Sequence, residues 1–371
     1  MEKLTKTRFL KLDLNSQNRY LFISDIHGNL SLLKKALTEV SFNKNDYLFL
    51  IGDLVEKGKE NLKILDYLMD LAQNYHIYFL RGNCDQVFNF LIPPVDKEKL
   101  LYFANIKGNS VINEMASLLN IALDESIDAD EVGKSFYESF KKYYDFVDSF
   151  YDVILLDEKY LLVHGGLDDL KAMPLYNDSL LKNDFYYFKA KYSPYIRIVG
   201  HNPTCNLCRE PASNKPIIDL DKNVIDIDGG NNVSLSGELN VLEIKSNKIS
   251  YKTFNEYELI TSTKKVINDN AKAFHTSSYL DNLKFKNEIL GDYYIVYKDG
   301  EKAYSHKKDV SFKNGKIFSY DATSNFINLN KGDTYYLAYY ASPFSLVIKD
   351  SEVGLLRNEV IADDLCSRRK I

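Results

Sequence analysis

Six side chains that commonly bind metal ions follow short apolar runs of the sequence, and each stands close to a glycine. They are Asp25, His27, Asp53, Asn83, His164 and His201. Carboxylates, imidazoles and amide oxygens together suit divalent ions such as manganese, iron, zinc or magnesium, and a carboxylate can bridge two ions about 3.5–4 Å apart. A single Asp or His after a strand is usually a turn former or a helix cap. Six in succession instead indicate a dinuclear metal site.

The elements that must position these residues alternate between strand and helix patterns. Residues 20–23, 47–51 and 77–80 are short apolar runs typical of buried strands, and residues 30–40 and 60–71 have the apolar spacing of amphipathic helices. Such a βαβαβ unit predicts parallel strands, whose carboxyl ends meet at one edge of the sheet. We therefore expect the candidate ligands to share that edge.

The next part of the chain predicts a helical insertion followed by further strands, which makes the fold class α+β. Residues 86–150 carry aromatic side chains at helical spacing, which fits a cap packed on the core or, alternatively, a wall of a substrate pocket. Longer apolar strands and then shorter alternating ones follow, and the shorter ones predict a second sheet of hairpins. The strands are expected at 153–156, 160–163, 196–199, 217–220, 224–227, 239–244 and 249–251.

The C-terminal part has a different pattern, so we divide the chain into a catalytic domain at 1–253, a linker at 254–288 and a β-barrel domain at 289–371. Polar stretches between Thr261 and Tyr279 suggest the linker. Asp299-Gly300 and Asn314-Gly315 are hairpin dipeptides between Tyr-rich runs. The runs predict strands and turns only, in a small closed barrel that loosely resembles bacterial SH3-like domains. Its tyrosines are expected in the core, with binding of a peptide or glycan as the alternative.

Five segments resemble, in chain order, the signature blocks of the calcineurin-like metallophosphoesterases, and most closely those of the bacterial phosphoprotein (serine/threonine) phosphatase branch. These segments read DIHGN, GDLVEKG, RGNCD, HGG and GHNPT. The resemblance extends over residues 18–253 and includes a closing block, IDIDGGNNVSLSGELNVLEI. It implies a four-layer αββα sandwich with the helical insertion. The motifs are specific for the fold and the metal site, and much less so for the substrate.

The resemblance also implies a role for each ligand. Asp25 and His27 would hold the first ion, Asp53 would bridge both, and Asn83, His164 and His201 would hold the second. A hydroxide shared by the two ions would attack phosphorus in line, without a covalent phosphoenzyme. The expected cofactors are two divalent ions, manganese first, with iron, zinc and magnesium as alternatives.

One departure from the family concerns the general acid. Cys84 stands where the family usually has the histidine that protonates the leaving oxygen. A thiol with a pKa of about 8.5 fits this task less well than an imidazole, which favours leaving groups of low pKa, as in aryl phosphates, phosphodiesters and pyrophosphates. Asp85 matches the acidic residue that orients the acid, a role that Cys84 puts in question.

A second departure concerns the cations that would hold phosphate. Lys57 replaces the family's arginine and keeps its charge without the bidentate fork. Asn83 and Arg81 are further substrate-binding candidates, although bracing of the loop is the simpler interpretation of Arg81. Arg197, within a strand, is no clear match for the family's second phosphate-binding arginine.

We therefore expect a metal-dependent phosphatase that hydrolyses phosphomonoesters, with phosphoprotein (Ser/Thr, or Tyr) first among substrates. The catalytic candidates are Asp53, Cys84, Asp85 and Lys57. The alternative is a phosphodiesterase or dinucleoside polyphosphate hydrolase of the same fold. A second alternative, prompted by Cys84 and Lys57, is a metal-binding regulatory pseudoenzyme. The partner would be a phosphorylated protein or small phosphoester, and the barrel could recruit a peptide or protein.

Composition argues against several other classes of protein. The chain has 371 residues and a net charge of −5, so there is no bulk positive field to hold nucleic acid. No apolar run approaches the roughly 20 residues of a membrane span. Four scattered cysteines do not form a disulfide framework, which favours the cytoplasm. Cys205 and Cys208 form a C-x-x-C pair, for which a redox or zinc role is the less favoured interpretation.

Overall fold

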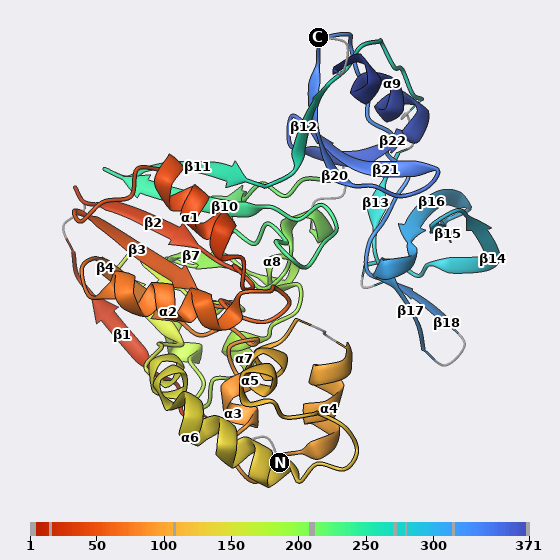
Figure 1. Cartoon of the computed structure of the whole chain (residues 1–371). Helices are drawn as coiled ribbons and strands as arrows, with labels where there is room; N and C mark the ends of the chain where they lie inside the picture. The colour runs from red at the N-terminus through yellow and green to blue at the C-terminus, as the bar shows by residue number, and fades with distance from the viewer. Residues whose placement is uncertain are drawn as a thin grey trace. The chain divides into compact units, whose positions relative to one another are not determined.

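The computed structural model describes residues 5–14, 17–106, 109–207, 212–269, 273–278, 280–313 and 316–368. The chain divides into two units (Figure 1). The first comprises Met1–Asn202, Pro216–Val233 and Leu239–Phe254, and the second Pro203–Lys215, Ser234–Glu238 and Asn255–Ile371. Among the described residues, no helix has the length and apolar character needed to cross a membrane.

The first sheet of the first unit holds the three predicted parallel strands. Its order is β11-β10-β2-β3-β4, with β2–β3 and β3–β4 parallel. The strands are β2 (Arg19–Ile23), β3 (Asp46–Ile51), β4 (His76–Leu80), β10 (Leu239–Lys245) and β11 (Lys248–Phe254). The prediction of parallel strands is confirmed, whereas β10 and β11 do not belong to a separate sheet of hairpins. They extend the first sheet because β10 pairs antiparallel with β2.

The second sheet has the order β1-β5-β6-β7-β9-β8. Its strands are β1 (Phe9–Leu12), β5 (Val153–Leu156), β6 (Tyr160–Leu162), β7 (Ile196–Val199), β8 (Ile217–Asp219) and β9 (Val224–Asp226). The sequence did not predict strand β1, because its FLKL segment is short and lacks a continuous apolar run. In the structure this strand is only partly buried. It pairs in parallel with β5.

Apolar side chains from both sheets form one buried cluster between them. Phe22 and Phe49 of the first sheet stack with ring centroids 5.2 Å apart, and they share this cluster with Leu162 and Ile198 of the second. Helices α1 (Leu30–Glu39) and α2 (Asn61–Ala72) pack on the outer face of the first sheet. The short helices α7 (Asp178–Leu181) and α8 (Tyr186–Lys189) contribute to clusters on the second. The result is a layered arrangement of two sheets with helices, as the resemblance implies.

The predicted insertion is helical. It contains α3 (Val87–Phe90), α4 (Lys97–Ile106), α5 (Val111–Leu119) and α6 (Ala129–Asp148). Buried residues of α6, among them Phe136, Tyr143 and Val147, belong to the same apolar cluster as α1 and α2. These contacts favour the cap interpretation over that of a pocket wall.

Two glutamates tie this insertion to the loop between β3 and α2. The Glu114 carboxylate on α5 accepts hydrogen bonds from the backbone N–H groups of Asn61 (2.7 Å) and Leu62 (2.9 Å), at the start of α2. In return, Glu56 Oε1 accepts from the backbone N–H of Val111 (2.8 Å), at the start of α5. Each helix start thus has a carboxylate near its positive end, supplied by the other segment.

The second unit is built mainly of antiparallel sheets. One has the order β12-β20-β21-β22, another β13-β19-β16-β15-β14, and β17 pairs with β18. The bounds are β12 (Glu258–Thr261), β13 (His275–Thr276), β14 (Lys284–Leu290), β15 (Tyr293–Lys298), β16 (Glu301–His306), β17 (Val310–Lys313), β18 (Lys316–Ser319), β19 (Ala322–Thr323), β20 (Thr334–Tyr339), β21 (Phe344–Lys349) and β22 (Glu352–Arg357).

This unit confirms one C-terminal prediction and corrects another. Asp299 and Gly300 both have positive φ and turn β15 into β16, as the dipeptide predicts. Strands β12 and β13 and most of β14 lie in the range expected to be a linker. The expectation of strands and turns only to the end of the chain is wrong, because α9 (Asn358–Arg368) follows β22 and buries Val360 and Ile361. Asn314-Gly315 lies outside the described residues, and the SH3-like topology stays a prediction.

We predict that Glu114→Ala lowers the free energy of unfolding by about 2 kcal/mol, because buried N–H groups at the start of α2 lose their charged acceptor. Urea unfolding followed by circular dichroism measures this change. The matched control is Glu138→Ala, on the exposed face of α6, which should shift the value by less than about 0.5 kcal/mol. Equal effects of the two substitutions would contradict the capping role.

Candidate metal centre

The loops after β2 and β3 form one hydrogen-bonded platform for the candidate ligands. Backbone N–H groups of Asp25 and His27 donate to the carbonyls of Gly52 (3.1 Å) and Asp53 (2.9 Å). Asp25, His27 and Asp53 have φ of 55°, 47° and 52°, in the left-handed region that residues other than glycine rarely adopt. Such strain persists where the surroundings over-determine the backbone, as they often do at functional sites.

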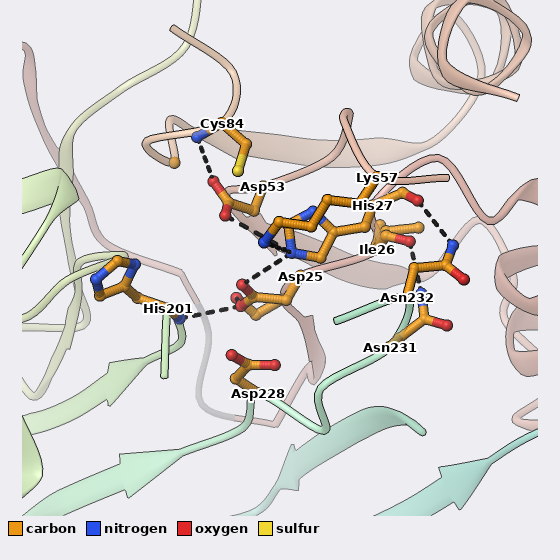
Figure 2. Close-up of polar contacts among 12 residues, drawn as sticks. Asp25, Ile26, His27, Asp53, Lys57, Cys84, His201, Asp228, Asn231 and Asn232 are labelled. Carbon is orange, nitrogen blue, oxygen red and sulfur yellow. Dashed lines mark hydrogen bonds and ion pairs between the residues drawn. The ribbon is translucent and has the colours of Figure 1, made fainter. Parts of the chain in front are cut away.

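Two asparagines of the closing block hold the first of these loops from another side. Asn231 Nδ2 donates to the carbonyl of Ile26 (2.6 Å) and Asn232 Nδ2 to that of His27 (2.9 Å), as Figure 2 shows. Sequence reasoning assigned neither residue a role. Their position in the GGNN segment of a recognised block was the available signal.

The candidate ligand atoms gather in two groups that share Asp53. One group is His27, Asp53 and Cys84, the other is Asp25, Asp53 and His164, and the ligand atoms within each group lie within 4.8 Å of one another. One Asp53 oxygen is 3.7 Å from His27 Nε2, and the other is 3.4 Å from His164 Nε2. This arrangement fits a carboxylate that bridges two ions. Asp25, expected to share an ion with His27, lies 3.7 Å from His27 Nε2 but belongs to the group of His164.

Backbone carbonyls set the orientation of both imidazoles. His164 Nδ1 lies 2.8 Å from the carbonyl oxygen of Ile51, and His27 Nδ1 lies 3.3 Å from that of Val55. A carbonyl accepts only, so each Nδ1 carries a proton and each Nε2 faces the carboxylates. Burial and the Lys57 ammonium lower the pKa of His27 to about 3, which keeps its imidazole neutral.

The buried carboxylates create a site that favours cations. Burial and the Asp53 charge raise the pKa of Asp25. For Asp53, burial acts in the raising direction, but His164, His27 and Lys57 outweigh it and lower the pKa. Burial would lower the pKa of His164, but Asp53 and Asp25 raise it. Oxygen and imidazole donors in this setting fit divalent metal ions.

Asn83 and His201 lie beside these groups. Asn83 Oδ1 is 3.3 Å from His164 Nε2. The His201 backbone N–H donates to Asp25 (3.1 Å), while its ring Nε2 lies 2.9 Å from the Asp184 carboxylate and its ring centroid 5.4 Å from that of His164. Sequence reasoning did not single out Asp184, because no strand end or glycine marks it.

Lys57 and Cys84 both reach the site. Lys57 Nζ lies 3.3 Å from His27 Nε2. Burial opposes its charge, but Cys84, Asp53, Asp25 and Asp228 together raise the Lys57 pKa, so the side chain remains an ammonium. The Cys84 backbone N–H donates to Asp53 (2.7 Å), and Figure 2 shows the sulfur beside that carboxylate.

Asp85 and Arg81 brace the loops that carry the ligands. Asp85 accepts hydrogen bonds from the backbone N–H groups of Gly82 (2.8 Å), Asp53 (2.9 Å) and Leu54 (2.9 Å). Burial and the nearby Asp53 charge raise the pKa of Asp85 to about 7. Arg81 is buried and donates to the carbonyl of Val147 at the end of α6 (3.3 Å). These contacts favour the bracing interpretation of Arg81.

Asp228 is a buried carboxylate that sequence reasoning did not assign. It lies next to Asp25 in Figure 2, and one of its oxygens accepts from the backbone N–H of Gly230 (2.7 Å). The other oxygen has no hydrogen-bond partner among the described residues. Burial, together with Asp25 and Asp226, raises its pKa well above the ordinary value.

The role of the C-x-x-C pair, for which a redox or zinc function is the less favoured interpretation, stays a prediction. Cys205 is buried in the second unit, with its sulfur 3.7 Å from the Ser234 hydroxyl, whereas Cys208 lies outside the described residues.

Arg197 is engaged away from the candidate ligands. Its guanidinium is fully buried and donates to the Asp168 carboxylate (2.5 Å), the Tyr186 hydroxyl (2.6 Å) and the carbonyl of Lys191 (2.5 Å). These contacts make Arg197 a structural residue of the second sheet.

We predict that Arg197→Met lowers the free energy of unfolding by about 3 kcal/mol, since buried acceptors lose their partner, while KM is unchanged. Urea unfolding and steady-state kinetics measure the two effects. The control is Lys182→Met at an exposed position of the same unit, with an expected shift within about 0.5 kcal/mol. A raised KM with unchanged stability would place Arg197 on the substrate.

Parts of the sequence are similar to known proteins. A symmetrical bis(5'-nucleosyl)-tetraphosphatase of Buchnera aphidicola subsp. Acyrthosiphon pisum (strain 5A) is 45% identical over 65 residues, which are 17% of this chain and 23% of that protein. One of Wigglesworthia glossinidia brevipalpis is 31% identical over 102 residues, 27% and 33% of the two chains. The chain thus matches a third or less of these relatives' length.

A solved structure and a family pattern complete the comparison. A protein serine/threonine phosphatase from Saccharomyces cerevisiae shares 11% identity and a TM-score of 0.41, over 68% of this chain and 85% of that one, a likeness that does not bear on the substrate. Residues 19–227, more than half of the chain, match the pattern described as calcineurin-like phosphoesterase. The chain therefore belongs to the calcineurin-like phosphoesterase family.

Proposed function

We propose that this phosphoesterase hydrolyses the phosphoric anhydride bonds of dinucleoside polyphosphates. The observation that carries the proposal is the position of Cys84, whose sulfur lies with His27 and Asp53 where the family has its proton-donating histidine. The similarity to symmetrical bis(5'-nucleosyl)-tetraphosphatases, 45% identity over 65 residues for one of them, supports it. This was the alternative in the sequence analysis, and we place it ahead of phosphoprotein because a thiol in place of the histidine suits a good leaving group.

The residues that would hold the metal ions are Asp25, His27, Asp53 and His164, which form the two groups of ligand atoms, together with Asn83 and His201 beside them. When bound, two divalent ions supply Lewis acidity toward phosphoryl oxygens and lower the pKa of a water. The protein keeps His27 and His164 oriented through the carbonyls of Val55 and Ile51. It also holds Asp53 through the Cys84 N–H.

The remaining side chains suit a substrate that needs little protonation of its leaving group. A thiol is a weaker match than an imidazole to a general acid working near neutral pH. A nucleoside polyphosphate leaves as a stable anion, whereas the alkoxide of phosphoserine requires a proton. The Lys57 ammonium can contact a phosphate oxygen as a point charge, and Arg81 and Arg197 are engaged in structural contacts.

Phosphoprotein is the second candidate substrate. It is favoured by the order and the residues of the signature blocks, which resemble those of bacterial phosphoprotein phosphatases. In that case the second unit, expected to be SH3-like, would recruit the protein partner. A metal-binding regulatory protein without turnover is the remaining alternative, and metal content together with activity separates it from both enzymes.

We predict that the manganese- or zinc-loaded protein hydrolyses diadenosine tetraphosphate at least about tenfold faster, in kcat/KM, than a phosphoserine peptide, a difference of about 1.4 kcal/mol. Chromatography of the nucleotide products and phosphate release measure the two rates. Cys84→His should raise the peptide rate relative to the nucleotide rate by about 100-fold, since it adds an imidazole acid. A wild-type preference for the peptide would overturn the first choice.

We also predict that Asp53→Asn reduces bound metal from two ions per chain to one or none, because the shared carboxylate is lost. Turnover should fall by about 10³-fold or more, which corresponds to several kcal/mol of lost charge stabilisation. Elemental analysis and the nucleotide assay measure both effects. Asp66→Asn, a half-exposed acid paired with Lys142, is the matched control. Full activity in Asp53→Asn would show that the assigned site is wrong.

A further inference from the structure

The sulfur of Cys84 belongs to one of the two groups of ligand atoms. Cys84 is 7% exposed and follows β4, and its sulfur lies within 4.8 Å of ligand atoms of His27 and Asp53. Ligands bind an ion such as zinc at about 2.0–2.3 Å, so two atoms on one ion are separated by at most about 4.6 Å. The spacing of the three side chains is therefore close to that of a common ion.

A hydrogen bond to the sulfur suits the anionic thiolate rather than a proton donor. Asn83 Nδ2 donates toward Cys84 Sγ at 3.5 Å, while Asn83 Oδ1 faces His164. An N–H donor favours a thiolate, which is the form that binds metal. A general acid would instead turn its proton toward the leaving group.

We infer that Cys84 is a thiolate ligand of the ion held by His27 and Asp53, and that this position therefore binds Zn²⁺ or Fe²⁺ in preference to Mn²⁺ or Mg²⁺. The inference rests on the proposed two-metal site and adds a ligand to it. Binding forms a sulfur–metal bond and releases the thiol proton to solvent, without a change of oxidation state. Thiolates select softer ions, whereas carboxylates and carbonyls suit manganese and magnesium.

This assignment changes what the two positions of the site are expected to hold. The group of Asp25, Asp53 and His164 offers only oxygen and nitrogen donors, whereas the group of His27, Asp53 and Cys84 adds sulfur. The two ions of one chain are therefore expected to differ in kind. A coordinated sulfur also carries no proton for the leaving group, in agreement with a substrate that has a good leaving group.

Cobalt(II) absorption tests the inference directly, because thiolate ligation produces an intense near-ultraviolet charge-transfer band that oxygen and nitrogen ligands do not. The protein is the full chain carrying Cys205→Ser, Cys208→Ser and Cys366→Ser, so that Cys84 is its single thiol. The apoprotein is titrated with cobalt(II) alone. We expect the charge-transfer band to grow with the first equivalents, together with the weaker visible bands of bound cobalt. Adding Cys84→Ser should remove the charge-transfer band and keep the visible ones.

The outcomes separate the inference from the proposed function. Visible bands without a charge-transfer band in the Cys84-only chain would overturn the thiolate ligand and leave the metal site standing. No bound cobalt at all would overturn both. If Cys84→Ser fails to fold, the Cys84-only chain still decides, because the band is either present or absent in it.

A competition between metals gives a second, independent measurement. Cys84→Ser should weaken zinc binding by at least about tenfold, since even changes beyond the direct ligands commonly cost 10- to 100-fold. The effect on manganese binding should be smaller, so the zinc-to-manganese affinity ratio falls. Calorimetric titration of each ion into apoprotein measures the ratio. An unchanged ratio would contradict the inference.

Discussion

The shared carboxylate of Asp53 is the interaction on which the site depends. Its two oxygens face His27 and His164, and one of them also accepts the backbone N–H of Cys84. A buried carboxylate is costly unless its surroundings compensate it, and the pKa of Asp53 stays low because the effects of His164, His27 and Lys57 outweigh that of burial. The loops after β2, β3 and β4 must therefore meet at one point, which the parallel order of these strands allows.

The part of this arrangement that sequence predicts is the part that local chemistry dictates. Continuous apolar runs, typical of strands that are buried on both faces, identify β2, β3 and β4. The polar, glycine-containing turns after these strands hold the ligands. Parallel pairing then brings Asp25, His27 and Asp53 to one edge. The two groups of ligand atoms include five of the side chains singled out from sequence, with Cys84 among them in a role that sequence reasoning assigned differently.

Features that depend on distant pairing could not be predicted in the same way. Strand β10 extends the first sheet by pairing with β2. Asn231 donates a hydrogen bond to the carbonyl of Ile26, which lies more than 200 residues earlier in the chain. The segment that forms α9 follows a strand directly and has little amphipathic character. Asp228 was invisible as a site residue because a single Asp in an alternating strand pattern reads as a solvent-facing position. It is buried in the loop after β9, beside Asp25.

The left-handed backbone at the ligand positions has a consequence for how this chain divides its residues between folding and chemistry. Asp25, His27, Asp53 and His201 all have positive φ, where glycine would be relaxed. Each such position costs about 1–3 kcal/mol that a glycine would largely avoid. A chain shaped by stability alone would place glycine there. The presence of carboxylates and imidazoles instead marks these turns as sites of a trade-off between stability and activity, which weighs against a purely structural role for this edge.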